Sequence, residues 1–210
     1  MTTPSGLVAV VSAAVTATII GFAGTAYAAP RTPSPPGGMH GDPAAAAPYW
    51  RLQRQDLDCG EMAVADVIGQ ITGNQPSEDE IDGAAENIPS GSRAGPIYGS
   101  SERTANHDLA VLLAHYGIQS DAVTTNLDAL ERALDQGRKV IAGVNSKTIW
   151  NRAGDRNVEN HFVVVTGIDN QAGVVHLNDS GVRGGRDEQV SIDTFEQSWN
   201  TSDDFAVITK

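Results

Sequence analysis

The chain has 210 residues, a formal net charge of -12 and a single cysteine, Cys59. This surplus of acidic residues argues against nucleic acid or an anionic membrane surface as a partner, because both would repel it. A lone cysteine forms no disulfide within its own chain. Cys59 is therefore either a small buried side chain or a residue kept for its chemistry.

The composition of the first 48 residues predicts two segments that precede a folded domain. Residues 1–28 carry no charge, and the apolar run Leu7–Ala23 is short and rich in small residues, which is typical of a signal peptide cleaved before Ala29. The usual basic residue near the start is missing, which leaves an uncleaved anchor or a misassigned start as alternatives. Residues 29–48, rich in proline, alanine and glycine, are expected to form a linker without a core. Residues 49–210 are predicted to be one domain of a secreted or cell-envelope protein.

The domain begins with helical patterns and continues with short apolar strands. Apolar residues recur at spacings of three and four from Cys59 to Ile71, which predicts a helix that ends at Gly73. Ser77 and Glu80 fit a capping box, so the acidic run there indicates a helix start rather than a calcium loop. Helices followed by short strands predict an α+β fold, in which the helix that carries the cysteine packs on a mostly antiparallel sheet. The other predicted elements are helices capped by Asn106 and Asn126 and strands over residues 139–144, 161–168, 174–178 and 205–209.

The loop between two of these strands determines which polar residues share a face of the sheet. If Asp169–Gly173 is a five-residue hairpin loop, Val163 lies opposite Asp179, and His161 shares a face with Asp179. A loop one residue longer or shorter would place Asn178 on that face instead. Either side chain could accept the imidazole N–H, and we favour Asp179.

Glutamine, cysteine, histidine and acid follow one another in the order of a papain-type cysteine hydrolase. Cys59 would be the nucleophile, because the unpaired N–H groups at a helix N-terminus favour a thiolate. His161 would act as base and then as acid, with Asp179 fixing its tautomer. Gln53 and the backbone N–H of Cys59 would hold the oxyanion, with Gln55 as the second candidate.

Two acidic neighbours are expected to oppose the thiolate. Asp58 and Glu61 place negative charge beside Cys59 and would raise the pKa of its thiol, although Asp58 is also a candidate helix cap. His161 therefore has to activate the thiol as an ion-pair partner. A zinc site would need histidines at a recognisable spacing from the cysteine, and none is present, so no metal and no other cofactor is expected.

The motifs that carry a family resemblance are Gln53 six residues before the cysteine, Asp58-Cys59-Gly60, His161–Gly167 and Leu177-Asn178-Asp179. With these motifs, the chain resembles the papain-like cysteine peptidases of the bacteriocin-processing, double-glycine leader peptidase group, specifically their secreted stand-alone relatives. The resemblance implies a papain-like fold, with Cys59, His161 and Asp179 as the catalytic set and Gln53 at the oxyanion site. Two positions depart from the pattern of the group. These are Glu61, where a small or apolar residue is usual, and Ser180, where proline commonly follows the acid.

These features predict a secreted cysteine peptidase that cleaves a peptide or amide bond through an acyl-thioester intermediate. We expect a peptide or protein substrate, no nucleic acid partner and no membrane association after signal cleavage, and we predict no oligomeric state. Leader cleavage is not carried over, because double-glycine leader peptidases are fused to a transporter. One alternative is an NlpC-type cell-wall peptide amidase, for which the interval from Cys59 to His161 is long. The other is a catalytically inactive papain-fold binding module, which a buried thiol or a glutamine pointing away would favour.

Overall fold

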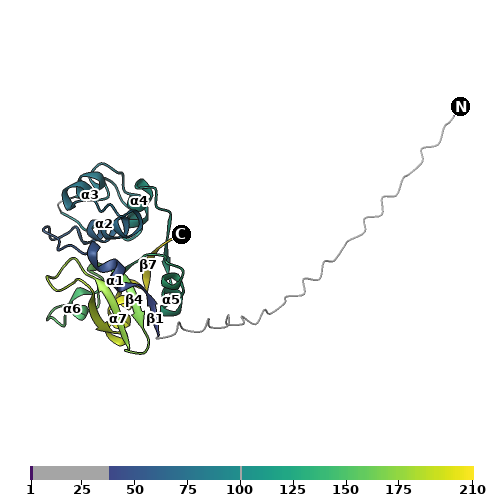
Figure 1. The fold of residues 1–210 in the computed structure, drawn as a ribbon. Helices are drawn as coiled ribbons and strands as arrows, with labels where there is room; N and C mark the ends of the chain where they lie inside the picture. The colour runs from purple at the N-terminus through teal and green to yellow at the C-terminus, as the bar shows by residue number, and fades with distance from the viewer. Residues whose placement is uncertain (2–37, 100) are drawn as a thin grey trace. The chain divides into compact units, whose positions relative to one another are not determined.

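A computed structural model describes Met1 and residues 38–210 except residue 100 (Figure 1). Apart from Met1, the predicted signal peptide over residues 1–28 lies outside the described residues, and so do residues 29–37 of the predicted linker. Within the described part of the chain, no helix is long and apolar enough to cross a membrane.

The strands of the described residues form one antiparallel sheet of seven strands. Six of them follow the order β2-β7-β3-β4-β5-β6, and β1 pairs with β4 outside this path. The predicted β3, β4, β5 and β7 are confirmed, whereas β1, β2 and β6 were not predicted. The strands are β1 (Met39–Gly41), β2 (Ser120–Thr124), β3 (Val140–Val144), β4 (His161–Asp169), β5 (Val174–Asn178), β6 (Glu188–Ser191) and β7 (Phe205–Thr209).

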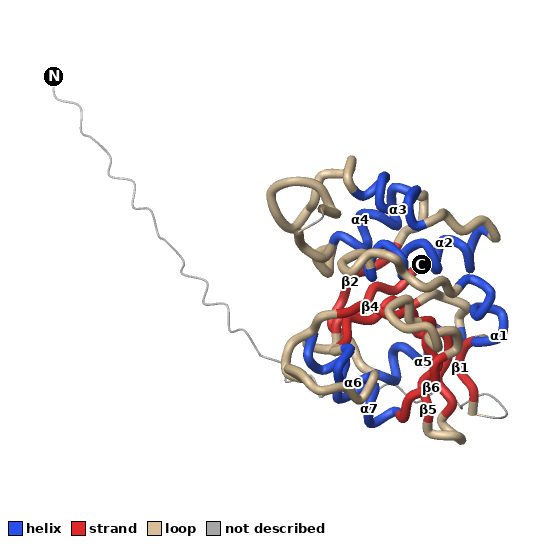
Figure 2. The backbone as a smooth tube through the Cα atoms, turned by 90° about the vertical axis from the view of Figure 1, so that its left-hand side faces the viewer, coloured by secondary structure: helices blue, strands red, loops and turns tan. Residues whose placement is uncertain are grey.

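Helices cover both faces of this sheet. Figures 1 and 2 show α2, α3 and α4 grouped on one side of the strands, with α5 and α7 beside the strands. The helices are α1 (Pro43–Ala46), α2 (Cys59–Thr72), α3 (Glu78–Ala85), α4 (Asp108–His115), α5 (Leu127–Asp135), α6 (Ser146–Ile149) and α7 (Ile192–Trp199), with 3₁₀ turns η1 (Ala47–Tyr49) and η2 (Asn200–Ser202).

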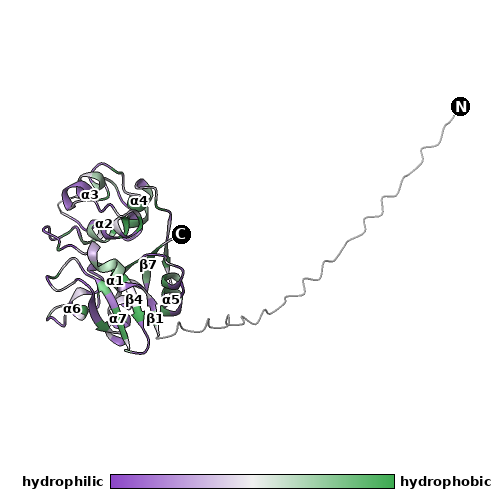
Figure 3. Cartoon of the chain, viewed as in Figure 1, coloured by the Kyte–Doolittle hydropathy of each residue, from purple (hydrophilic) through white to green (hydrophobic). Residues whose placement is uncertain are grey.

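The side chains of β4 alternate between two apolar cores. Phe162 and Val164 pack with α2, α3 and α4 in one core, while Val163 and Val165 pack with α5 and α7 in the other. Figure 3 shows β4 in the green of hydrophobic residues. Successive side chains of a strand point to opposite faces of the sheet, and here both faces are covered. The fold is therefore a helix–sheet–helix sandwich with β4 in the middle layer.

Helix α2 confirms the predicted cysteine helix and is a buried central element. All residues from Cys59 to Gly69 are buried, and Gly73 ends the helix with a left-handed φ of 74°. The predicted capping box of Ser77 at the start of α3 is also confirmed. Asn106, by contrast, does not cap α4. Its side-chain amide donates to Glu159 instead, at 2.7 Å.

The predicted linker is wrong for its last residues, because the part after residue 38 belongs to the fold. Strand β1 pairs with β4, and His40 and Ala46 are each only 3% exposed. The physical reason lies in the length of β4, whose nine residues extend beyond β3 and leave an edge that β1 pairs with. Pro43 packs closely against Gly167 of that edge. The folded domain therefore begins before Tyr49.

The β4–β5 hairpin corrects the predicted loop. Ile168 pairs with Val175 rather than with Val174, so the loop is one residue shorter than predicted. A one-residue change in register turns every following side chain to the other face. Taken alone, the shorter loop would have turned Asn178 toward His161.

A β-bulge in β4 cancels this shift. Thr166 is an extra residue without a partner on β5, and beyond it Val164 lies opposite Asn178. This is the register that the sequence predicted for the end of the hairpin. Two opposite errors, in loop length and in ladder regularity, thus left the predicted position of Asp179 correct.

Candidate active site

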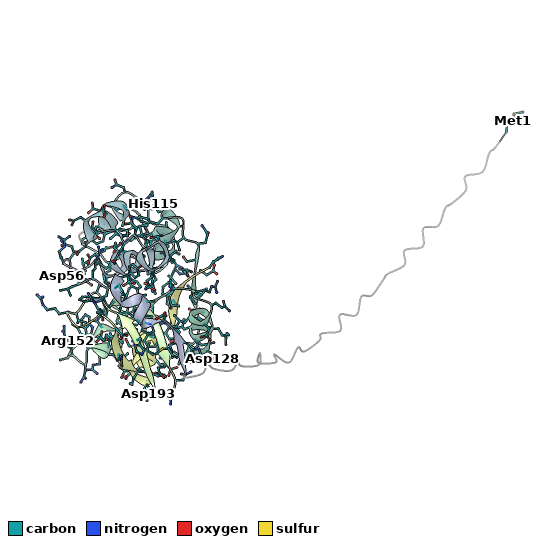
Figure 4. The ribbon with its side chains drawn as sticks, viewed as in Figure 1. Met1, Asp56, His115, Asp128, Arg152 and Asp193 are labelled. Carbon is teal, nitrogen blue, oxygen red and sulfur yellow. The ribbon has the colours of Figure 1, made fainter. Side chains whose placement is uncertain are left out.

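Cys59 is the first residue of α2 and lies in an open cleft of about 520 Å³. The residue is 2% exposed, and the unpaired N–H groups of the first helical turn place partial positive charge near the sulfur. Figure 4 labels Asp56, which lines this cleft, and Arg152, which lies on the same side of the domain. The other lining residues are Gln53, Arg54, Gln55, Leu57, Arg103, Ser146, Lys147, Trp150, Asn160, His161 and Gly181.

His161 opens β4 and contacts both the cysteine and the acid that the sequence pairs with it. Its Nε2 lies 2.7 Å from Oδ1 of Asp179, which leaves Nδ1 as the ring nitrogen available to the Cys59 thiol. Burial disfavours the imidazolium. The charge and hydrogen bond of Asp179 and the contact with Cys59 outweigh burial, however, and raise the pKa of His161 to about 10. The arrangement therefore favours a positively charged histidine beside the thiol.

Asp179 is fully buried and receives several hydrogen bonds. Oδ1 also accepts the backbone N–H of Gly181 at 2.7 Å, and Oδ2 accepts the indole N–H of Trp150 at 2.8 Å. Burial favours the neutral acid, but the charge of His161 and these hydrogen bonds hold the pKa of Asp179 below its ordinary value. Burial and the charge of Asp179 in turn raise the pKa of Glu188, on β6, to about 7.

Asn178, the alternative to Asp179, points to the opposite side of the sheet. Its amide donates to Oδ2 of Asp66 on α2 at 2.9 Å and to the carbonyl of Ala46 at 3.0 Å. It makes no hydrogen bond to His161. Of the two residues that the hairpin pattern left open, Asp179 is the one that contacts His161.

Gln53 lines the cleft and is tied to the residue after the acid. Its Oε1 accepts the hydroxyl of Ser180 at 2.9 Å, and its Nε2 donates to the carbonyl of Gln55 at 2.7 Å. Both glutamines border the cleft. The structure links Gln53, and not Gln55, to the loop of Asp179 through a side-chain hydrogen bond. Serine in place of proline at position 180 supplies the hydroxyl for that bond.

The two acids beside Cys59 carry less negative charge than the sequence suggests. Burial raises the pKa of Asp58 to about 9, with Glu78 and Asp82 contributing, and burial raises that of Glu61 to about 7. Asp58 occupies the N-cap position of α2 but makes no capping hydrogen bond with its side chain. At neutral pH these two acids therefore place less negative charge beside Cys59 than two fully ionised carboxylates would.

Asp58, Glu78 and Asp82 form an acidic cluster in which one carboxylate oxygen of each residue lies within 4.8 Å of the others. Glu78 is already paired with a cation. Its Oε2 accepts Nε of Arg54 at 2.5 Å, and its Oε1 accepts the backbone N–H groups of Arg54 and Gln55. The guanidinium of Arg54 offsets part of the charge of this cluster, and burial raises the pKa of Asp58 and of Asp82, which favours their neutral forms.

The comparisons with known proteins identify the family. The model of the family described as the Peptidase_C39 like family matches residues 49–207. The chain belongs to this family. Uncharacterized proteins of Mycobacterium bovis and Mycobacterium tuberculosis are 43% identical to this C39-like chain over 199 residues, covering 82% of it and 85% of each relative.

Two crystal structures support the fold of this C39-like chain. One is described as a C39-like peptidase from Bacillus anthracis, with 17% identity and a TM-score of 0.61, covering 82% of this chain and 97% of that one. The other is a double glycine motif protease from an AMS/PCAT transporter in complex with its leader peptide. It is 14% identical with a TM-score of 0.50, covering 75% of this chain and 88% of that one. The predicted α+β papain-like fold is thereby confirmed.

Two tryptophans of this C39-like chain contact Asp179 and were not predicted to do so. Trp150 bonds its carboxylate, and its ring centre lies 5.2 Å from that of His161. Trp50 donates to its backbone carbonyl at 2.6 Å. A buried tryptophan usually needs an acceptor for its indole N–H. The presence of these tryptophans is therefore the one sequence signal for such contacts. That signal does not say which acceptor each indole finds.

Proposed function

We propose that this C39-like chain is a secreted cysteine peptidase in which Cys59, His161 and Asp179 form the catalytic triad. The observation that carries the proposal is the 2.7 Å contact between His161 and Asp179 in a cleft that also holds Cys59. A nucleophile, a base within its reach and a third group that orients the base form the recurring arrangement of nucleophilic catalysis. Export rests on the composition of residues 1–28.

In the first step the thiolate of Cys59 attacks the carbonyl carbon of a peptide, and the carbonyl electron pair moves to oxygen. Gln53 stabilises this oxyanion together with the backbone N–H of Cys59. The Nε2 of Gln53 carries two hydrogens, of which one is bonded to the carbonyl of Gln55 and the other serves the oxyanion. The proton on Nδ1 of His161 passes to the departing amine as the C–N bond breaks.

In the second step water hydrolyses the acyl-thioester. His161, now neutral, removes a proton from water through Nδ1, while Asp179 holds the N–H of Nε2 and keeps the ring oriented. The oxyanion forms again at the same donors and collapses as the C–S bond breaks. Cys59 leaves as a thiolate beside the imidazolium, which restores the ion pair for the next turnover.

Turnover of a library of quenched fluorescent peptides, combined with mass spectrometry of the trapped acyl-enzyme, tests this function. Cys59→Ala is expected to abolish cleavage and acyl-enzyme. Gln53→Ala should lower kcat roughly 100- to 1,000-fold, as loss of an oxyanion donor does, whereas the neighbouring Gln55→Ala serves as the matched control. Equal losses in both glutamine variants would contradict the role of Gln53.

A second function, a peptide-binding groove without chemistry, is supported by two observations. Cys59 is only 2% exposed, and the amide of Gln53 already donates to a neighbouring carbonyl. The same peptide library separates the two functions. If both the native chain and Cys59→Ala bind a peptide and neither cleaves it, the function is peptide binding and not peptidase activity.

A further inference from the structure

The proposed catalytic acid lies just beyond the end of the sheet ladder. Strand β5 pairs with β4 as far as Asn178 and with β6 as far as Leu177. The backbone carbonyls of Asp179 and Ser180 therefore find their partners outside the sheet. Buried carbonyls need a hydrogen-bond donor, so whatever supplies it also fixes the direction of this peptide.

The donors come from the segment before the catalytic helix, residues 46–53, which we call the N-terminal arm. The arm makes a hydrogen bond to each of three consecutive residues around the acid. These bonds join the carbonyl of Ala46 to the amide of Asn178 at 3.0 Å, the indole of Trp50 to the carbonyl of Asp179 at 2.6 Å, and the backbone N–H of Gln53 to the carbonyl of Ser180 at 2.9 Å.

The N-terminal arm is itself anchored on α2 and its following turn. A Cβ on Gly69 would lie 2.5 Å from the ring of Tyr49, so the tyrosine packs directly on the helix backbone. The side chain of Gln75 donates to the carbonyl of Tyr49 at 2.6 Å, and the guanidinium of Arg186 lies 5.4 Å from the ring centre of Trp50. The arm thus connects the helix that carries the nucleophile to the loop that carries the acid.

We propose that Trp50 is a positioning residue that sets the orientation of Asp179 toward His161, an inference that rests on the proposed function. Trp50 touches no reacting atom. Its indole N–H satisfies the carbonyl of Asp179 and thereby fixes the peptide from which the carboxylate projects. The same peptide leads into Ser180, whose hydroxyl bonds the side chain of Gln53. The N-terminal arm therefore couples the acid of the triad to the oxyanion donor.

The test compares Trp50→Phe with Trp199→Phe in the full chain. Trp199 is the matched control, because its buried indole also donates to a backbone carbonyl, that of Phe205 at 2.7 Å, and Trp199 does not line the cleft. The expected result for Trp50→Phe is a fall in kcat of roughly 10- to 100-fold with little change in KM, as small misplacements of catalytic groups produce. Trp199→Phe should leave kcat unchanged in the folded fraction.

A second readout needs no substrate. The Nε2–H of His161, bonded to Asp179, is expected to give a downfield proton resonance that is assigned by its loss in His161→Ala. This resonance should shift or broaden in Trp50→Phe and stay in place in Trp199→Phe. If Trp50→Phe does not fold, benzothienylalanine at position 50 replaces only the N–H with sulfur and keeps the ring shape. An unchanged resonance in a folded position-50 variant would overturn the positioning role. Because this resonance reports geometry, it still decides the role of Trp50 if the native chain cleaves no peptide and the proposed function fails.

Discussion

The carboxylate of Asp179 lies between His161 and Trp150, with the histidine on one oxygen and the indole on the other. His161 lies 2.7 Å from Oδ1, and the indole of Trp150 donates to Oδ2 at 2.8 Å. Because Asp179 is fully buried, water cannot replace either partner. The acid is thus held from both sides while its charge faces the histidine.

Removing the indole donor is expected to weaken the fold and the site together. Trp150→Phe leaves Oδ2 of Asp179 without its donor, and the loss of a partner for a buried charged acceptor costs about 1–3 kcal/mol. Urea unfolding at pH 7 measures this loss. Arg152→Ala is the control, because it removes the guanidinium 4.7 Å from the Trp150 ring centre but keeps the N–H. A similar loss in both variants would contradict the hydrogen bond as the cause.

The reactivity of the cysteine should depend on His161. The raised pKa of His161, about 10, keeps the imidazolium charged through neutral pH, so iodoacetamide should label Cys59 rapidly at pH 6. His161→Ala should slow labelling at pH 6 about tenfold or more, because the thiolate loses its ion-pair partner. His176→Ala is the matched control, since its Nδ1 contacts Asp187 at 2.6 Å in a separate histidine–aspartate pair. Equal labelling rates for the native chain and His161→Ala would contradict the role of Cys59 as a nucleophile activated by His161.

The buried acid next to the cysteine should make stability depend on pH. Burial raises the pKa of Glu61 to about 7, so its contribution to stability is complete below the ordinary value and is lost as pH rises through 7. Glu61→Gln does not ionise and keeps an oxygen for the Thr104 hydroxyl. The variant should exceed the native chain by about 1–3 kcal/mol in unfolding free energy at pH 8.5 and match it at pH 4.

Urea titrations at these two pH values check this prediction, with the exposed Glu86→Gln as control. If the difference in unfolding free energy between Glu61→Gln and the native chain is the same at pH 4 and at pH 8.5, burial of Glu61 is not the cause.

The contribution of β1 can be tested at Gly41. A Cβ at this position would lie 2.5 Å from the carbonyl oxygen of Thr166, so Gly41→Ala should push β1 away from β4. Gly173→Ala is the control, because Gly173 also has a positive φ but no atom within 4 Å of its added Cβ. The expected loss of unfolding free energy is about 1–3 kcal/mol greater for Gly41→Ala, as for other forced overpacking. Equal losses would mean that β1 adds little to the stability of the domain.

The sequence by itself determined the elements whose signals are local. The spacing of apolar residues placed Cys59 at the first residue of a buried helix, and a continuous apolar run placed His161 at the start of the central strand. Such patterns survive folding, because a helix or strand repeats its apolar positions along its own length. The α+β class and the order of the candidate residues followed from them.

Only the tertiary structure decided the contacts that orient those residues. The bulge at Thr166 depends on the neighbours of β4 on both edges, and the role of Trp50 depends on where a distant loop ends. The protonation of Asp58 and Glu61 depends on burial by segments far away in the chain. Local periodicity carries no record of such partners, because the energies of burial and hydrogen bonding arise between residues that become neighbours only when the chain folds.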